Sequence, residues 1–220
     1  MSGEELHKSY SARWENMWTQ DGVLKPGQAF DAAKSSPALS AQLASGGLDV
    51  CGKRVLVPGC GRGYDLVEFA RAGAGLAAGL ELAPTAAAAA EAYLGEALSG
   101  EEAAHVQVHS GDFFAWKCPT GEAFDLGFDY TFMCALHPNM RADWATSWAR
   151  LLAPGATLAC LAFPLNHDKE TGPPWPVTEQ MYKDLLLPAG FTLVREEPVP
   201  AELSHAGRGG KEALLVFRRT

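Results

Sequence analysis

The sequence predicts an α/β protein with one mainly parallel sheet and helices on both of its faces. Apolar runs alternate with helical patterns along the chain, as they do where crossover helices join parallel strands. The first apolar run, 54–58, leads into a glycine-rich turn that contains Gly59, Gly61 and Gly63. An acid, Glu81, follows the next apolar run. This order of strand, glycine turn, helix, strand and acid is typical of a nucleotide-binding half-domain.

The first twenty residues predict an amphipathic helix, because large apolar side chains recur at four-residue steps and so share one face. These side chains are Leu6, Tyr10, Trp14 and Trp18. A tryptophan pair at this spacing more often docks a helix than contacts a ligand, although aromatic faces also attract cations. A turn-rich stretch follows, and then a short helix over Pro37–Leu43. We therefore expect a helical cap over residues 1–45 within a single domain, 1–220.

Six further strands and four further helices complete the predicted pattern. The strands are Leu76–Leu80, His105–His109, Phe124–Phe128, Thr157–Phe163, Thr192–Glu196 and Ala213–Phe217. The helices are Tyr64–Ala72, one that opens at Pro84, Asn139–Leu152 and Thr178–Leu187. Proline suits the first turn of the Pro84 helix, and the alanine run that follows has the highest helix propensity. The long proline-rich loop 164–176 is expected to lie over a binding site.

The glycine turn and Glu81 together indicate a nucleotide-like ligand. Glycines let backbone N–H groups approach a ligand closely, and the acid can accept hydrogen bonds from ribose hydroxyls. Tyr64 stands where a dinucleotide-binding pattern requires its third glycine, and its bulk argues against a bound pyrophosphate. The alternative interpretation is a strand–turn–helix corner without a ligand.

Acidic and aromatic residues follow two later strands, at the sheet edge where parallel sheets bind their ligands. Asp112 and Phe113 could contact an adenine ring, but a solvated turn would have the same sequence. Asp129 and Tyr130 follow the predicted strand that ends at Phe128. Asp129 could attract a positive charge in the ligand, or it could cap the helix that comes next. The pattern alone leaves both alternatives open.

Composition argues against several classes of function. A formal net charge of -8 does not attract a phosphate backbone, so we expect no nucleic-acid partner. The chain has no basic segment followed by an apolar core and no apolar stretch long enough for a bilayer, so we expect neither a signal peptide nor a membrane partner. The five cysteines form no CxxC pair and predict reduced thiols in a cytoplasmic protein. The six histidines lack metal-ligand spacing, so we expect no metal.

In combination, these motifs resemble the thiopurine S-methyltransferase superfamily, and most closely its halide/thiol methyltransferase branch. The segments that carry the resemblance are 14–18, 55–65, 124–130 and 138–141 together with Glu81, the Gly-Pro-Pro-Trp loop at 172–175, and 207–212. The resemblance covers nearly the whole chain. It implies a class I methyltransferase fold with a seven-stranded sheet, and S-adenosylmethionine as the methyl donor.

The resemblance also implies roles for individual residues. Those at cofactor-contacting positions are Trp14, Trp18, Gly59, Gly61, Glu81, Asp112, Phe113 and Asp129. Residues 1–45 would then cap the cofactor site. Those expected to form the acceptor pocket are Tyr130, Arg141 and Trp175, although Arg141 could also be a solvated helix charge. Because Trp175 replaces a tyrosine of the plant halide enzymes, and His137 a glutamate, we expect the acceptor pocket to differ more than the donor site.

The implied function is methyl transfer to a small soft nucleophile, either a small molecule or an inorganic anion. Thiols, bisulfide, thiocyanate and halides are ionised or readily become so. Methyl transfer to them therefore needs alignment of the reacting atoms and removal of water rather than a dedicated base. One alternative is a methyltransferase for a larger metabolite at O or N, with Asp129 or His137 as its base. The other alternative is a cofactor-binding protein without turnover. We expect a monomer.

Overall fold

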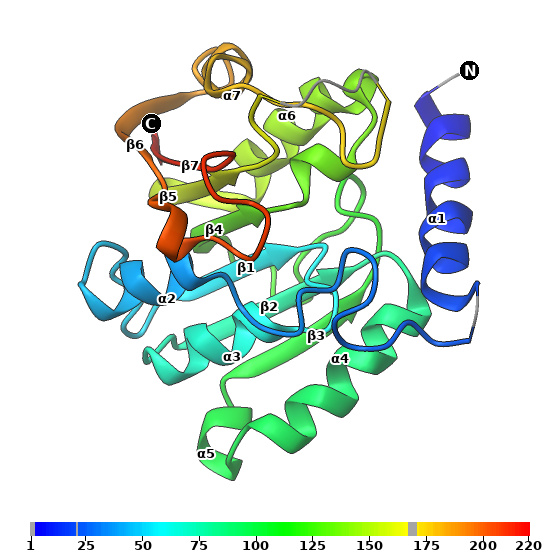
Figure 1. Ribbon diagram of the computed structural model, residues 1–220. Coiled ribbons are helices and arrows are strands. Elements are labelled where there is room, and N and C mark those ends of the chain that lie inside the picture. Colours follow the sequence, from blue (N-terminus) through cyan, green and yellow to red (C-terminus); the bar gives the residue numbers. More distant parts are fainter. Residues whose placement is uncertain (1–2, 21, 167–170) are drawn as a thin grey trace.

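The computed structural model describes residues 3–20, 22–166 and 171–220, with side chains from residue 9 onward. It contains one seven-stranded sheet (Figure 1). The strands are β1 Arg54–Pro58, β2 Leu76–Glu81, β3 Val106–Ser110, β4 Phe124–Tyr130, β5 Leu152–Ala162, β6 Phe191–Pro198 and β7 Ala213–Arg219. They lie in the order β3-β2-β1-β4-β5-β7-β6. β7 is antiparallel to both of its neighbours, and the other pairs are parallel.

The helices match the predicted order, with one short addition. They are α1 Gly3–Thr19, α2 Pro37–Ala44, α3 Tyr64–Arg71, α4 Pro84–Ala97, α5 Gly100–Ala103, α6 Arg141–Leu151 and α7 Glu179–Leu186. The additional helix, α5, is a single turn held by a capping box between Ser99 and Glu102. Short 3-10 turns cover Met133–Ala135, Pro138–Met140 and Ala201–Leu203. Within the described part of the chain, no helix has both the length and the apolar character needed to cross a bilayer.

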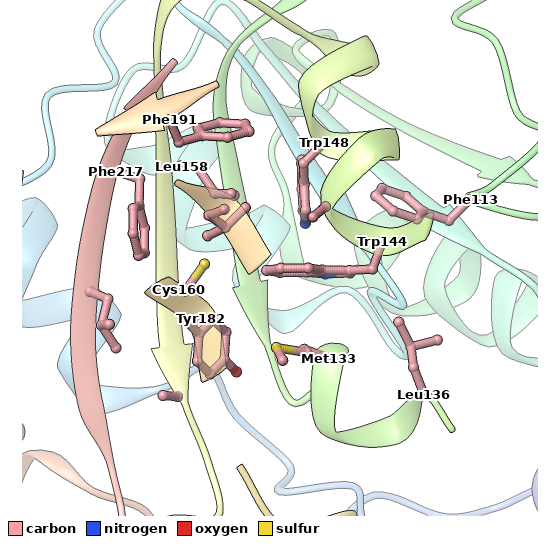
Figure 2. Packing of buried hydrophobic residues seen from close by; sticks show 14 of the residues in the cluster. Phe113, Met133, Leu136, Trp144, Trp148, Leu158, Cys160, Tyr182, Phe191 and Phe217 are labelled. Carbon is pink, nitrogen blue, oxygen red and sulfur yellow. The ribbon is translucent and has the colours of Figure 1, made fainter. Parts of the chain in front are cut away.

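Tryptophans of α6 form the centre of the core on one face of the sheet. Trp144 and Trp148 are fully buried and point from α6 towards β4 and β5, beside Tyr182 of α7 (Figure 2). A Cβ atom at Gly127 of β4 would lie only 2.4 Å from Trp148 Cζ3. Glycine at this position therefore leaves room for the edge of the Trp148 indole ring against the strand, and α6 packs close to the sheet.

Helices α2, α3 and α4 cover the opposite face (Figure 1). Phe69 of α3 packs edge-on against Phe128 of β4, with ring centroids 5.6 Å apart. Helix α1 stands beside the sheet (Figure 1). Its Tyr10 joins the core on the α6 face, and its Trp18 packs against Ala83 and Ala86 at the start of α4. On the predicted apolar face of α1, Tyr10 and Trp18 are buried and Trp14 is half-buried, whereas the Leu6 side chain lies outside the described residues.

Several predicted boundaries were wrong, and at β4 and β5 the reason is that strand pairing extends further than the apolar pattern. Asp129 and Tyr130 belong to β4 rather than following it, since they pair with Cys160 and Leu161 of β5. β5 itself begins at Leu152, well before the expected start at Thr157. The helix expected from Asn139 begins at Arg141, because a 3-10 turn precedes it.

Candidate functional site

A cavity of about 550 Å³ opens where β1, β2, β3 and β4 end. The strand order reverses between β1 and β4, and ligands of open α/β sheets bind at such a switch point. The volume is within the usual range for a small-molecule site. Its wall comes from α1, from the segment 29–36, from the loops after these strands, and from Phe163, Pro173, Pro174, His205 and Arg208.

The loop after β1 contributes bare backbone to this wall. Gly59 and Gly61 have φ values of 58° and 54°, in the left-handed region that disfavours residues with a side chain. A Cβ atom at Gly59 would also lie 2.7 Å from Cδ2 of Phe132. At Gly59, backbone conformation and lack of space therefore both require glycine. The turn leaves room for a ligand against the main chain.

Glu81 at the end of β2 presents a fixed carboxylate to the cavity. Its side chain accepts backbone hydrogen bonds from Gly61 at 3.0 Å, Leu82 at 2.8 Å and Ala83 at 3.2 Å. Burial raises the pKa of this carboxyl, and the residue is only 6% exposed. Carboxylate oxygens have further lone pairs, so the three N–H groups orient Glu81 without using all of its capacity for ligand hydroxyls.

Asp112 and Phe113, just beyond β3, lie on the same wall. The Asp112 carboxylate accepts the Phe114 N–H at 3.0 Å, which fixes the turn. Phe113 is 4% exposed and packs edge-on against Phe132, with ring centroids 5.1 Å apart. The structure thus brings an acid and a flat apolar side chain together on the wall that also carries Glu81.

Both N-terminal tryptophans reach the cavity. Trp18 is buried, and a Cβ atom at Gly61 would lie 3.8 Å from its Cζ2 atom. Phe30 packs edge-on against Trp14 and Trp18, with centroid distances of 5.5 and 5.8 Å. The same side chains therefore dock α1 and line the cavity, so the two predicted roles of this pair are compatible.

Polar contacts that the sequence did not indicate hold α1 in place. The carboxylate of Glu15 accepts hydrogen bonds from the backbone N–H of Thr85, at 3.2 Å, and from its hydroxyl. Arg13 donates to the carbonyl oxygen of Gly172 at 3.0 Å. The helix is thus tied to the first turn of α4 on one side and to the loop before α7 on the other. Their partners are distant in sequence, so no local pattern reveals these contacts.

A cation lies on the cavity wall near the end of β4, two strands away from β2, which carries Glu81. The Arg208 guanidinium lies 4.5 Å from the ring centroid of Phe163 and donates to the Tyr130 hydroxyl at 2.7 Å. No carboxylate of the described residues forms an ion pair with it. His205 stacks on the Tyr130 ring, and burial together with Arg208 lowers its pKa to about 4. His205 is therefore neutral at neutral pH.

Asp129 does not line the cavity. Its carboxylate accepts hydrogen bonds from the Met133 N–H at 3.1 Å and from Trp144 Nε1 at 2.7 Å. It is 1% exposed, and burial raises its pKa to about 6. These bonds agree with the capping alternative, because Met133 begins the 3-10 turn after β4.

Arg141 and Trp175 also lie behind the wall rather than on it. Arg141 is 6% exposed and donates to the carbonyl oxygen of Pro176 at 3.1 Å. Trp175 packs edge-on against His137, with centroids 5.0 Å apart, and sits behind the Pro173 and Pro174 that line the cavity. His137 is also off the wall, and its Nδ1 accepts the Asn139 N–H. These residues therefore shape the cavity through the loop they support.

Comparison with known proteins gives a consistent result. The model of the thiopurine S-methyltransferase (TPMT) family matches residues 9–212. Thiocyanate methyltransferase 1 of Brassica oleracea is 36% identical over 206 residues, which cover 94% of this chain and 84% of that protein. Probable thiol methyltransferase 2 of Arabidopsis thaliana is 34% identical over 215 residues, covering 98% of this chain and 88% of that protein.

Solved structures show the same fold at low sequence identity. The 1,6-didemethyltoxoflavin-N1-methyltransferase of Burkholderia thailandensis superposes with a TM-score of 0.69 at 21% identity, covering 100% of this chain and 91% of that one. The magnesium protoporphyrin IX methyltransferase of Synechocystis gives 0.67 at 17% identity, with 99% and 94% covered. The sheet is therefore that of the class I methyltransferases. Because the family model matches almost the whole chain, this protein belongs to the thiopurine S-methyltransferase family.

Proposed function

We propose that this protein transfers the methyl group of S-adenosylmethionine to small soft nucleophiles, with thiocyanate, bisulfide, small thiols and halides as its acceptors. The relatives are named for thiocyanate and for thiols. The observation that supports this acceptor class best is Arg208, a cation on the cavity wall with no carboxylate partner among the described residues. Such a cation attracts a small anion into the cavity.

The residues around Glu81 fit the cofactor. In this proposal Glu81 accepts hydrogen bonds from the ribose hydroxyls, Gly59 and Gly61 leave room for the ligand, and Phe113 contacts the adenine ring beside Asp112. When bound, the cofactor supplies a methyl group on a positively charged sulfur. Trp14 and Trp18 line the cavity, and aromatic faces attract such a cation by roughly 0.5–2 kcal/mol.

A buried hydroxyl on the cavity wall, that of Tyr10, also favours an anionic acceptor. The Tyr10 hydroxyl, Trp175 Nε1 and Arg141 Nε are all buried and make no hydrogen bond with a described residue. They lie near one another, since Trp175 and Arg141 both lower the pKa of Tyr10 against the larger effect of burial. Of these three groups only the Tyr10 hydroxyl lies on the cavity wall, where an anion in the cavity would give it a hydrogen-bond partner. In this proposal Tyr130 contacts the acceptor directly, whereas Arg141 and Trp175 act on it through the loop behind Pro173 and Pro174.

The cap is proposed to exclude water from the reacting atoms. Residues 1–45 supply α1 and the segment 29–36, which lie on the wall. Removing water from a soft anion raises its reactivity towards the methyl group. All five cysteines are unpaired. Unpaired thiols support a protein that works in the cytoplasm, and we propose that it acts as a monomer.

The alternative function, methylation of a larger metabolite at O or N, would need a base, and neither Asp129 nor His137 is placed to act as one. Asp129 has both carboxylate oxygens engaged and His137 has its Nδ1 engaged, and neither lies on the cavity wall. An acceptor screen with a methyl-labelled donor tests the function, using iodide, thiocyanate, bisulfide and small thiols. We expect labelled product with at least one of them. Tight donor binding without transfer to any would contradict the proposal and indicate a binding protein.

A further inference from the structure

A buried carboxylate lies directly behind the acceptor end of the cavity. Glu212, just before β7, is 2% exposed, and its Oε1 accepts a hydrogen bond from the Tyr130 hydroxyl at 2.6 Å. Its other oxygen, Oε2, is also buried and accepts no hydrogen bond from the described residues. Glu212 does not line the cavity, whereas Tyr130 does. The tyrosine hydroxyl is therefore the link between the cavity and this carboxylate.

The direction of the hydrogen bonds along this link is fixed by Arg208. A guanidinium can only donate, so the 2.7 Å contact from Arg208 Nη1 makes the Tyr130 oxygen an acceptor there. The hydroxyl hydrogen then points to Glu212. A hydroxyl oxygen has two lone pairs, and the second one can accept a hydrogen bond from a ligand. Burial holds the pKa of Tyr130 well above its ordinary value, so this side chain stays neutral and can relay a proton but not act as the base.

We propose that Tyr130 and Glu212 form a proton relay that serves acceptors which still carry a proton, such as thiols and hydrogen sulfide. This inference rests on the proposed function. It concerns only protonated acceptors, because iodide and thiocyanate have no proton to lose. Tyr130 would contact the acceptor, and Glu212 would act through Tyr130.

The relay conserves atoms and charge. The acceptor S–H bond breaks as its proton moves to the Tyr130 oxygen, and the tyrosine proton moves to Glu212. The electron pair left on the acceptor sulfur forms the new bond to the methyl carbon. The bond from that carbon to the donor sulfur breaks, and its electron pair stays on the donor sulfur. One positive and one negative charge, on the donor and on Glu212, are neutralised together.

The charged and titratable groups around the relay do not compete for this proton. Arg208 faces the hydroxyl, and a guanidinium has no acceptor for a hydrogen. His205 stacks on the Tyr130 ring and is neutral at neutral pH, since its pKa is lowered to about 4 by burial and by the charges of Arg208 and Lys34. Glu212 is therefore the one carboxylate in hydrogen-bond contact with Tyr130 in the described structure.

The test compares Glu212→Gln with Glu202→Gln, which removes the same charge from an exposed carboxylate of the preceding 3-10 turn. The specificity constants for a small thiol and for thiocyanate are measured from about pH 6 to about pH 9, a range that spans the ordinary thiol pKa. We expect Glu212→Gln to lower the thiol constant about tenfold or more relative to the thiocyanate constant at the acidic end. The difference should shrink towards alkaline pH, where the thiol ionises in solution. Glu202→Gln should behave as wild type.

Two further measurements and one replacement variant make the result decisive. Melting temperature and calorimetric affinity for the donor, measured on each variant, report whether the fold and the donor site are intact. If Glu212→Gln does not fold, Tyr130→Phe replaces it, and the thiol-to-thiocyanate ratio against pH remains the measured quantity. Equal losses for both acceptors, or a ratio independent of pH, would overturn the relay. A wild-type protein that methylates neither acceptor would instead contradict the proposed function.

Discussion

Asp31 and Arg62 form a buried ion pair, with a distance of 3.0 Å from Nε to Oδ2 and side chains that are 3% and 10% exposed. Asp31 belongs to the segment that follows α1, and Arg62 to the glycine turn after β1. The same carboxylate accepts the Tyr64 hydroxyl at 3.0 Å and the Ala33 N–H at 2.7 Å. Ala33 has a φ of 58°, which is unfavourable for a residue with a side chain. Asp31 therefore stabilises a strained cap segment and ties it to the glycine turn.

Asp31→Asn should destabilise the protein and weaken donor binding together. The substitution keeps the shape of the side chain but leaves the Arg62 cation buried without a counter-charge, which typically costs about 3 kcal/mol. Denaturant unfolding and calorimetry with the donor measure the two effects. Asp49→Asn is the matched control, because Asp49 pairs with Lys53 at the surface and is 68% exposed. Equal losses of stability in the two variants would show that the buried pair does not hold the cap.

Glu81→Gln should reduce donor affinity while the protein stays folded. It removes the charge and one acceptor oxygen, and a lost charge-assisted hydrogen bond costs about 1–3 kcal/mol, or roughly 5- to 150-fold in affinity. Glu91→Gln, at an exposed position of α4, loses the same charge away from the cavity. Calorimetry measures the donor affinity of wild type, Glu81→Gln and Glu91→Gln. Unchanged affinity in Glu81→Gln would remove this residue from the cofactor site.

Asp129→Asn should change how stability depends on pH. Burial raises the Asp129 pKa from 3.8 to about 6, so the folded state keeps this proton where the unfolded state has lost it. The group therefore stabilises the fold below the unfolded pKa, and this contribution disappears as pH rises through about 6. At about 1.4 kcal/mol per unit of pKa shift, the change is of the order of 2–3 kcal/mol.

His205 acts in the opposite sense over the same range, because its pKa is lowered from 6.5 to about 4 and its contribution is lost as pH falls. In Asp129→Asn the Asp129 contribution is gone, and of these two opposing pH effects on stability only that of His205 remains. Unfolding free energies of Asp129→Asn, measured between about pH 4 and about pH 7, should therefore rise with pH more steeply than those of wild type. Parallel curves for the two proteins would contradict the raised pKa of Asp129.

Local signals predicted most of the fold. The apolar run Arg54–Pro58, bounded by turn residues, was predicted with the boundaries that β1 has in the structure. The errors arose where distant partners decide the outcome. Asp129 and Tyr130 join β4 because β5 pairs with them, and no apolar pattern indicates that pairing. The single-turn helix α5 was missed because four residues are too few to show a helical period.

In the candidate site, too, local patterns predicted some residues and missed those that distant contacts bring together. Gly59, Gly61 and Glu81 lie close together in sequence, and their spacing predicted their place on the wall. Asp129 and Tyr130 are neighbours on a strand, so their side chains point to opposite faces and only Tyr130 reaches the cavity. Alternation within the strand could have excluded one of the two. Arg208 and Glu212 lie in the segment 207–212 that carries part of the family resemblance, but no local pattern indicates that they meet Tyr130 from 78 and 82 residues away.

The most direct test of the central claim is the specificity constant for thiocyanate in wild type, Arg208→Gln and Lys211→Gln. Both substitutions remove one positive charge from the same loop, but only Arg208 lines the cavity, and Lys211 is exposed. We predict that Arg208→Gln lowers the constant at least tenfold, equivalent to about 1.4 kcal/mol of lost transition-state stabilisation, while donor affinity stays near that of wild type. Lys211→Gln should change neither. Equal constants in all three proteins, or no reaction of thiocyanate and the other soft anions with wild type, would contradict the account.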